Sequence, residues 1–394
     1  MRPKSGLPKR KSLRREPKWD HAFRDHPRNA ALRHPNFGGS APIAPKSTVV
    51  SLFSGAGGFD LGFLGGFRSV GQEREALPFD LIAAYDNDPR AVETYQLNLS
   101  DDVSCLDLTT VAANDLPAAD VLIGGFPCQD FSSCGPKDGF EGKRGRLYQV
   151  MTEYAEAHQP RVIVAENVPH LAKMQGGAML RDIVADFAAT GYRTEVWILP
   201  CPDFGLPQSR KRIFIVSVRE DIDGMPIPPR PTHAGRHIPI DEAIDDLMAI
   251  EDETIPNQSQ YFVATKATAG AGQGDQVSQR GKLAYTVRAN AKARIHFHYE
   301  LERRLTVREC ARLQAFPDEF VFPFFAMNSM LQIGNAVPPI IGHSIGRAIS
   351  TFLHDGQTRE AHDFMSPLIH PEFSDDHLGL LFAATLYELQ REVA

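Results

Sequence analysis

Short apolar runs that alternate with stretches of helical spacing constrain the fold of this 394-residue chain more than any other feature. The runs are bounded by glycine, proline or charged residues, and each has the length of a buried strand. They lie at residues 47–53, 79–86, 119–125, 161–167, 194–200 and 212–218. Strands that alternate with helices predict an α/β fold with a mostly parallel sheet covered on both faces. The close spacing of the last two runs predicts that they pair antiparallel.

Residue types that are common in ligand-binding and catalytic sites lie at the ends of these runs. In a mostly parallel sheet the carboxyl ends of neighbouring strands meet at one edge, where ligands bind. A glycine-rich turn at 55–58 follows the first run, Asp86 ends the second, Cys128 follows the third and Glu166 ends the fourth. Glycines let a backbone approach a nucleotide-like ligand, and an acid at the second strand tip is typical of a ribose contact. Asp86 is also a candidate N-cap of the next helix.

Cys128 and Glu166, together with two arginines, indicate covalent chemistry. A thiolate is a strong nucleophile, but it needs an electrophile that the site activates. Glu166 is able to protonate a ring nitrogen if its apolar neighbours raise its pKa. Arg210 and Arg212 are two residues apart, hence on one face of an extended chain. The set suits attack on an electron-poor heterocycle, whereas each residue alone also fits an inert thiol or a surface ion pair.

At these residues the chain resembles the DNA cytosine-5 methyltransferase family of the bacterial restriction-modification type, from about residue 47 to about residue 350. The matching motifs, in order, are "FSGAGG" (53–58), "GGFPCQDFS" (124–132), "ENV" (166–168), "QSRKR" (208–212), "RRLTVRECARLQAFP" (303–317) and "IGNAVPP" (333–339). The resemblance implies a Rossmann-like S-adenosylmethionine-dependent methyltransferase fold with a smaller target-recognition domain. Ser51 departs from the pattern, because the family usually has Asp there, and this puts one water-mediated cofactor contact in doubt.

The resemblance also implies roles for single residues. Cys128 would attack C6 of a cytosine flipped out of duplex DNA, Glu166 would engage N3 and the amino group, and C5 would take the methyl group of S-adenosylmethionine. Arg212 would hold the cytosine O2, while Arg210 would support the site and a nearby phosphate. The implied cofactor contacts are Phe53, Gly55, Gly57, Gly58, Asp86, Asp107, Phe126 and Asn335. The implied DNA contacts are Gln129, Ser132, Arg144, Arg288 and Arg294. The cysteine spacing predicts no zinc site, and we expect no metal.

Charge and composition divide the chain further. Residues 1–46 are rich in Lys and Arg although the whole chain carries a net charge of −7, which predicts a flexible basic arm or an arm that contacts DNA. We expect a catalytic domain at 47–220 and 326–354, a target-recognition domain at 221–325, and a helical C-terminal extension at 355–394. Glycines between 135 and 145 predict a mobile loop that carries Arg144.

The expected target-recognition domain is rich in Gly, Gln, Asn, Lys and Arg, the polar ones being residues that contact base edges and phosphates. Apolar and polar residues alternate at 285–288 and at 294–298. This alternation predicts two half-buried strands whose polar side chains, including His298, face outward.

Two other properties follow from what the sequence lacks. No stretch approaches the roughly 18 apolar residues of a membrane span, and the N-terminus lacks the apolar part of a secretory signal, so we expect a cytoplasmic protein that associates with the nucleoid on DNA. We expect a monomer, and a cognate restriction endonuclease is a candidate partner with no stable complex implied. Three other functions fit the sequence less well. The RNA-methylating branch of the family usually carries a Cys-Phe-Thr signature, which this chain lacks. A non-catalytic relative would ordinarily lose Cys128 or Glu166, and a plain oxidoreductase would leave the motifs unexplained.

Overall fold

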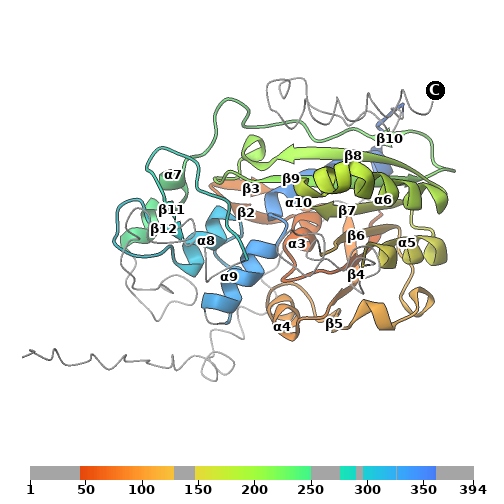
Figure 1. The fold of residues 1–394 in the computed structure, drawn as a ribbon, viewed down its shortest axis with the longest axis horizontal. Helices are drawn as coiled ribbons and strands as arrows, with labels where there is room; N and C mark the ends of the chain where they lie inside the picture. Colours follow the sequence, from red (N-terminus) through yellow and green to blue (C-terminus); the bar gives the residue numbers. More distant parts are fainter. Residues whose placement is uncertain (1–44, 128–146, 250–275, 290–295, 325, 361–394) are drawn as a thin grey trace, which may run out of the picture.

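The computed structural model describes residues 45–127, 147–249, 276–289, 296–324 and 326–360. A seven-stranded sheet forms the centre of this part of the chain (Figure 1). Its spatial order is β5 (Val103–Cys105), β4 (Phe79–Asp86), β1 (Ser47–Leu52), β6 (Val121–Gly125), β7 (Val162–Asn167), β9 (Lys211–Arg219) and β8 (Tyr192–Pro200). Neighbours from β5 to β7 pair parallel, and β9 pairs antiparallel with both β7 and β8. The predicted α/β fold and the antiparallel last pair are confirmed.

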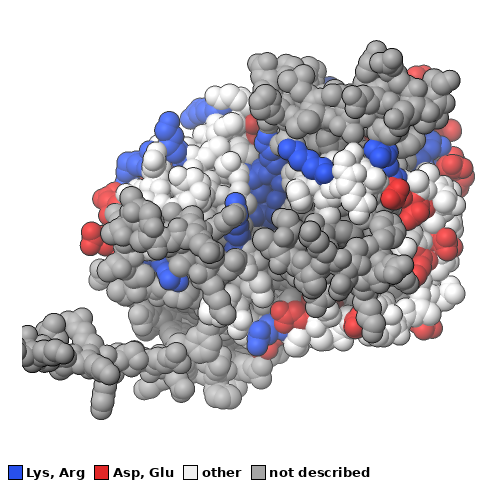
Figure 2. All heavy atoms as spheres, in the orientation of Figure 1, with Lys and Arg blue, Asp and Glu red and all other residues white. Residues whose placement is uncertain are grey.

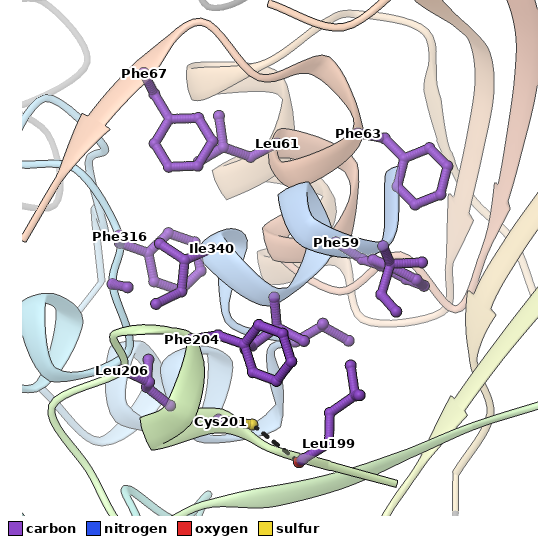
Figure 3. Close-up of a cluster of buried hydrophobic side chains, with 14 of the residues drawn as sticks. Phe59, Leu61, Phe63, Phe67, Leu199, Cys201, Phe204, Leu206, Phe316 and Ile340 are labelled. Carbon is purple, nitrogen blue, oxygen red and sulfur yellow. Dashed lines mark hydrogen bonds between the residues drawn. The ribbon is translucent and has the colours of Figure 1, made fainter. Parts of the chain in front are cut away.

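Both faces of the sheet are buried because successive strand residues point to opposite sides. Val49 of β1 packs into an apolar cluster with α3 (Gly58–Leu64) and α10 (Pro339–Asp355), part of which Figure 3 shows. The next residue, Val50, packs into a second cluster. The helices of that second cluster are α5 (Leu147–His158) and α6 (Ala178–Ala189). A fifth helix, α4 (Pro89–Asn98), packs on β4 and β5.

Helices α3 and α10 touch through their backbones. A Cβ placed on Gly62 of α3 would lie 2.5 Å from the Cα of Gly342 in α10, and a Cβ on Gly346 would lie 3.3 Å from the Cα of Phe63. Glycine is therefore required at the crossing. The contact joins the glycine turn that precedes α3 to the helix that follows the last sequence motif.

Shorter elements complete the described chain. They are β2 (Phe67–Ser69), β3 (Gln72–Arg74), β10 (Met225–Pro226), α7 (Ile240–Ile244), β11 (Gln276–Val277), β12 (His296–Phe297), α8 (Val307–Leu313), α9 (Ala326–Asn335), β13 (Thr358–Arg359) and the 3₁₀ turns η1 (Leu108–Thr110), η2 (Ala113–Asp115), η5 (Pro169–Gly177), η6 (Cys201–Phe204) and η7 (Asp245–Ala249). Figure 1 shows α7, β11, β12 and α8 grouped on the side of the molecule away from α5 and α6. Ile240 of α7 and Val307 of α8 belong to the apolar cluster of α3 and α10, so the group shares a core with the sheet. The domain boundaries given above remain predictions.

Two local predictions are wrong. Residues 285–288 form no strand, since Ala284 makes a single isolated bridge to Gln208 and the following peptide groups bond to side chains instead. His298 was predicted to face outward, but it is fully buried. Burial of this polar ring is possible because its Nδ1 accepts hydrogen bonds from the backbone N–H groups of Glu300 and Leu301, at 3.0 and 3.2 Å. A polar side chain at an alternating position thus caps a turn inside the protein.

Several predictions fall outside the described residues. These are the arm before residue 45, the loop with Cys128, Gln129, Ser132 and Arg144, the side chain of Arg294, and the helix expected after residue 360. Within the described ranges, no helix combines the length and the apolar character that crossing a membrane requires.

Candidate active site

The end of β7 carries a buried carboxyl group that is paired with an arginine. Oε1 of Glu166 lies 2.7 Å from Nε of Arg212 at the start of β9, and both side chains are about one-tenth exposed, at 10 % and 11 %. Glu166 lies opposite Gly125 in the parallel β6–β7 register. A Cβ on Gly125 would lie 3.2 Å from Oε2 of Glu166. The carboxyl group therefore covers the strand end that leads, three residues later, to Cys128.

Burial controls the protonation of Glu166. Removal from water raises its pKa, and this effect outweighs the opposing charges of Arg212 and Arg210. A carboxyl with a raised pKa keeps its proton to a higher pH than a surface glutamate does. Such a group is suited to give a proton to a bound ring nitrogen.

Asn167 fixes the start of the segment that carries the predicted nucleophile. Its Nδ2 donates to the carbonyl of Phe126 at 3.0 Å, and its Oδ1 accepts from the N–H of Val168 at 2.8 Å. The ring of Phe126, a predicted cofactor contact, is buried with its centroid 6.2 Å from that of Tyr148. Asn167 was not among the predicted site residues, although the ENV motif contains it.

The glycine turn after β1 is tied to the end of β4. The N–H of Gly55 donates to Oδ2 of Asp86 at 2.8 Å, and the N–H of Asp88 donates to Oδ1 at 2.9 Å. Burial raises the pKa of Asp86, against these backbone hydrogen bonds. The N-cap of α4 is Asp88, which accepts from the N–H of Arg90, so the alternative of Asp86 as the cap is wrong.

The predicted cofactor glycines differ in their surroundings. Gly55 has φ +56°, and no other atom of the described residues lies within 4 Å of where its Cβ would be, its chain neighbours apart. A Cβ on Gly57 would lie 2.3 Å from Cδ1 of Leu99, and a Cβ on Gly58 would lie 2.5 Å from the carbonyl oxygen of Val337. Gly57 and Gly58 are thus needed for packing against α4 and the segment after α9. Gly55 is the position where a ligand has room to lie against the turn.

Three other predicted cofactor residues lie near strand or helix ends. Phe53 directly follows β1 and adopts the left-handed φ of 56°. Asp107 is exposed and caps η1, where its Oδ1 accepts from the N–H of Thr109 at 3.1 Å. Its neighbour Leu106 donates its N–H to the carbonyl of Asp86, so both acids lie at the same edge of the sheet. Asn335 is exposed at the end of α9.

Arg210 faces the interior. Its Nη1 donates to the carbonyl of Val287 at 2.9 Å, and its Nη2 donates to those of Gly334 and Ala336 at 3.0 and 3.1 Å. Burial and the nearby charge of Arg212 lower its pKa to about 9. Because the side chain is buried and its Nη atoms are used by carbonyls, the structure contradicts the predicted phosphate contact of Arg210.

Basic side chains gather on one face of the molecule. Figure 2 shows Lys and Arg in a band across the middle of this face, with most Asp and Glu toward its outer edges. Arg288, a predicted DNA contact, is exposed. The overall negative charge of the chain therefore does not describe this face.

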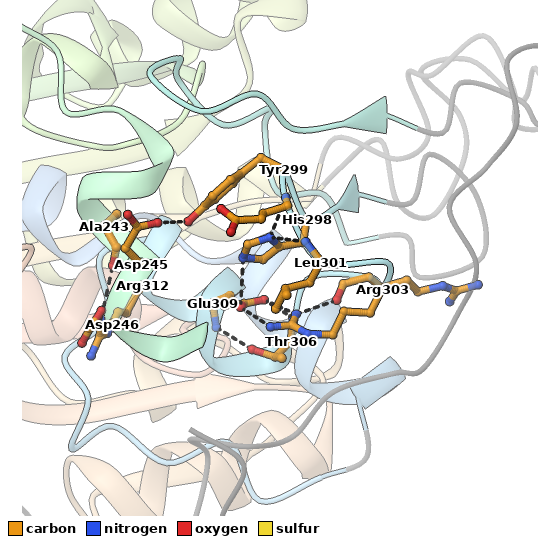
Figure 4. A network of polar contacts seen from close by, with 12 residues as sticks. Ala243, Asp245, Asp246, His298, Tyr299, Leu301, Arg303, Thr306, Glu309 and Arg312 are labelled. Carbon is orange, nitrogen blue, oxygen red and sulfur yellow. Dashed lines mark hydrogen bonds and ion pairs between the residues drawn. The ribbon is translucent and has the colours of Figure 1, made fainter. Parts of the chain in front are cut away.

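A second buried carboxyl group, Glu309, lies in the network that Figure 4 shows. Arg303 donates to both of its oxygens at 2.7 and 2.8 Å, and the N–H of Thr306 donates to Oε2 at 2.7 Å. Thr306 in turn caps α8 by accepting from the N–H of Glu309. Nε2 of the buried His298 lies 3.7 Å from Oε1. This carboxyl group holds the start of α8.

Comparisons of sequence identify relatives of this chain. The family model described as C-5 cytosine-specific DNA methylase matches residues 47–269 and 242–351. The Type II methyltransferase M.NgoFVII of Neisseria gonorrhoeae is 32 % identical over 324 residues, which are 75 % of this chain and 84 % of that protein. The Type II methyltransferase M.BspRI of Lysinibacillus sphaericus is 32 % identical over 360 residues, covering 79 % of this chain and 83 % of the relative.

Solved structures share the fold at lower identity. Dnmt2 methyltransferase of S. pombe aligns with a TM-score of 0.55 and 18 % identity, over 78 % of this chain and 100 % of that one. The methyltransferase EhMeth of Entamoeba histolytica aligns with a TM-score of 0.58 and 15 % identity, over 78 % and 98 %. These structures bear on the fold alone.

Proposed function

The chain belongs to the C-5 cytosine-specific DNA methylase family and is a DNA cytosine-5 methyltransferase, and we propose that it acts on a specific sequence of double-stranded DNA by covalent catalysis from Cys128. The observation that carries the proposal is the buried Glu166–Arg212 pair above the strand end that leads to Cys128. A cytosine inside a duplex cannot reach these groups. The target base must therefore be flipped out of the helix.

The proposed reaction assigns one task to each residue. The Cys128 thiolate adds to C6 and forms a carbon–sulfur bond, while Glu166 gives its proton to N3 and accepts a hydrogen bond from the amino group. Arg212 donates to the cytosine O2 and keeps Glu166 in place. Addition at C6 breaks the aromaticity of the ring and makes C5 electron-rich. After methyl transfer the C5 proton is lost to solvent, the thiolate is expelled and the N3 proton returns to Glu166, which restores the ring and the starting enzyme.

S-adenosylmethionine supplies the methyl group when it is bound. The open space at Gly55 lies beside the carboxylate of Asp86. It fits a cofactor whose ribose hydroxyl groups donate hydrogen bonds to Asp86. We assign the adenine side of the pocket to Phe53, Asp107 and Phe126, as the family motifs imply. Asn335 is proposed to reach the cofactor from the end of α9.

The proposed DNA contacts are Arg288 together with Gln129, Ser132, Arg144 and Arg294. The band of Lys and Arg in Figure 2 supports the binding of a polyanion such as DNA on the face that the figure shows. Because the relatives named above are Type II methyltransferases, we propose that the enzyme protects DNA in a restriction-modification system. It is proposed to act as a monomer in the cytoplasm, without a stable complex with the nuclease.

Methyl transfer by the purified protein tests this function. Duplex DNA, single-stranded DNA and transfer RNA would each be incubated with S-adenosylmethionine, and nucleosides would be analysed by mass spectrometry. We expect 5-methylcytosine in duplex DNA with the wild type and none with Cys128→Ser. Methylation of RNA alone, or equal methylation by Cys128→Ser, would overturn the proposal.

A further inference from the structure

Three buried side chains join the ends of α8 and α9 and the segment 284–287 to the start of β9, and we call Gln208, Arg210 and Gln314 the polar clamp. Their exposures are 0, 2 and 0 %. Nε2 of Gln208 donates to the carbonyl of Leu313 at 2.6 Å and to Oε1 of Gln314 at 2.7 Å. Nε2 of Gln314 donates to the carbonyl of Ala336 at 2.6 Å. Buried hydrogen bonds are directional, so the ends of α8 and α9 are fixed relative to the start of β9.

The polar clamp holds Val287 by both of its peptide groups. Oε1 of Gln208 accepts from the N–H of Val287, and Nη1 of Arg210 donates to its carbonyl, each at 2.9 Å. Three residues earlier, the chain pairs by backbone, since the N–H of Ser209 donates to the carbonyl of Ala284 at 2.8 Å. The segment 284–287 therefore starts beside the extension of β9 and is then held by side chains. This explains why no strand forms there.

Helix α9 closes the other side of this segment. A Cβ on Gly334 would lie 2.2 Å from the N of Ala289 and 2.3 Å from the carbonyl carbon of Arg288. Nη2 of Arg210 donates to the carbonyl of Gly334 at 3.0 Å. The backbone of Arg288 is thus confined between the clamp and α9, while its side chain is exposed.

The same stretch of chain positions the catalytic pair. Arg212, which lies 2.7 Å from Glu166, follows Arg210 by two residues in the extended start of β9. One short segment therefore sets both the acid–base pair and the backbone that carries Arg288. Loss of a clamp hydrogen bond would therefore change the position of the Arg288 backbone relative to the Glu166–Arg212 pair.

We propose that the polar clamp is a positioning device that presents Arg288 to the edge of a base beside the target cytosine, in register with the Glu166–Arg212 pair. The inference rests on the proposed function. An arginine whose backbone is fixed on two sides needs no backbone ordering on binding, and arginine pairs bidentately with guanine edges. The clamp residues are buried and bond within the protein, so their proposed role is to position Arg288.

Sequence discrimination tests the clamp. A base-resolution methylation map with the wild type first defines the preferred site and its single-base variants. Discrimination is then the ratio of kcat/KM for preferred and altered duplexes, measured for Arg288→Ala, Gln314→Met and Arg210→Lys, with calorimetric affinity for S-adenosylmethionine measured beside it. Gln332→Met is the matched control, because Gln332 is also a buried glutamine but bonds to Thr94 at 2.8 Å.

Gln314→Met is expected to lower the ratio by at least about tenfold at the base position that Arg288→Ala relaxes, with cofactor affinity within about twofold of the wild type. Arg210→Lys keeps the charge and is expected to act in the same direction, which covers the case that Gln314→Met does not fold. An unchanged ratio in folded clamp variants, or an equal loss at every base position, would overturn the inference. A wild type that methylates no DNA would instead defeat the proposed function.

Discussion

Glu166 and Glu309 are both buried glutamates that pair with an arginine, yet their surroundings differ. Glu309 receives two hydrogen bonds from Arg303 and one from the N–H of Thr306. Glu166 is within ion-pair distance of Arg212 through one oxygen, while its other oxygen faces Gly125 at the strand end. Glu309 ties the turn before α8 to the helix, whereas Glu166 keeps one oxygen directed toward the segment that carries Cys128.

The difference distinguishes a structural carboxylate from a reactive one. A carboxylate whose oxygens are already taken by three donors, as in Glu309, has its hydrogen-bonding capacity committed to the fold. A buried carboxyl with fewer donors has a raised pKa and keeps hydrogen-bonding capacity for a substrate. Substitution of each residue should therefore produce opposite outcomes for activity and stability.

The largest expected effect is on catalysis by Glu166→Gln. The variant should bind S-adenosylmethionine normally but lose about 10²- to 10⁴-fold in the rate of methyl transfer, since proton donation to N3 is removed. In the wild type, kcat/KM for DNA should fall as pH rises through the raised pKa of Glu166, because the protonated form is the donor. Initial rates from pH 5 to pH 9 measure both.

Glu195→Gln is the matched control for that experiment. Glu195 is also buried in the sheet and is paired with Arg359. Its variant should retain the wild-type rate at temperatures where it is folded. Equal losses in both variants would show that burial of an acid in this sheet, and not the position of Glu166, matters.

Glu309→Gln should have the next largest effect, on stability. Loss of the negative charge leaves Arg303 without its carboxylate partner, which costs about 3 kcal/mol of unfolding free energy, although the Gln oxygen can still accept from the N–H of Thr306. Urea denaturation measures the change, and the methylation rate of the folded variant should stay near that of the wild type. A stable variant without activity would assign Glu309 to the catalytic group instead.

Another buried acid, Asp60 of α3, gives a smaller effect that depends on pH. It accepts from the hydroxyl of Tyr95 at 3.0 Å, and burial raises its pKa from 3.8 to about 6. Since the folded pKa is above the unfolded one, the stability it contributes is complete below pH 4 and is lost as pH rises through about 6. Unfolding free energies of Asp60→Asn and the wild type should diverge by about 2 to 3 kcal/mol over this window. Parallel curves would contradict the burial effect.

The smallest expected effect concerns the salt dependence of DNA binding. Arg288→Ala should reduce the slope of log Kd against log salt by less than about one, because a base contact releases fewer counterions than a phosphate contact does. Fluorescence anisotropy at several salt concentrations measures the slope. A decrease of one full unit with unchanged sequence preference would place Arg288 on a phosphate.

Much of the sheet could be predicted from sequence because its strands are apolar and buried on both faces. Runs such as 161–167 and 212–218 became β7 and β9, whereas the short β5 gave no such signal. The pattern at 285–288 misled, since its backbone bonds to Gln208 and Arg210 from a distant part of the chain.

The candidate site was predictable to the extent that it lies on strand ends. Glu166 and Arg212 could be expected at one edge, and the structure places their atoms 2.7 Å apart. The inward orientation of Arg210 was not predictable, because alternation along a strand gives no information on what packs against each face. Gln314 contacts Gln208 across 106 residues of sequence, which no local pattern reveals.

Base-resolution mapping of 5-methylcytosine in a plasmid tests the central claim most directly. The plasmid would be grown in a methylation-free host with the wild type, with Cys128→Ser or with Glu166→Gln. We predict methylation at one short motif with the wild type, none with Cys128→Ser and little with Glu166→Gln. An unmethylated plasmid despite folded, cofactor-binding wild-type protein, or full methylation by Cys128→Ser, would contradict the account.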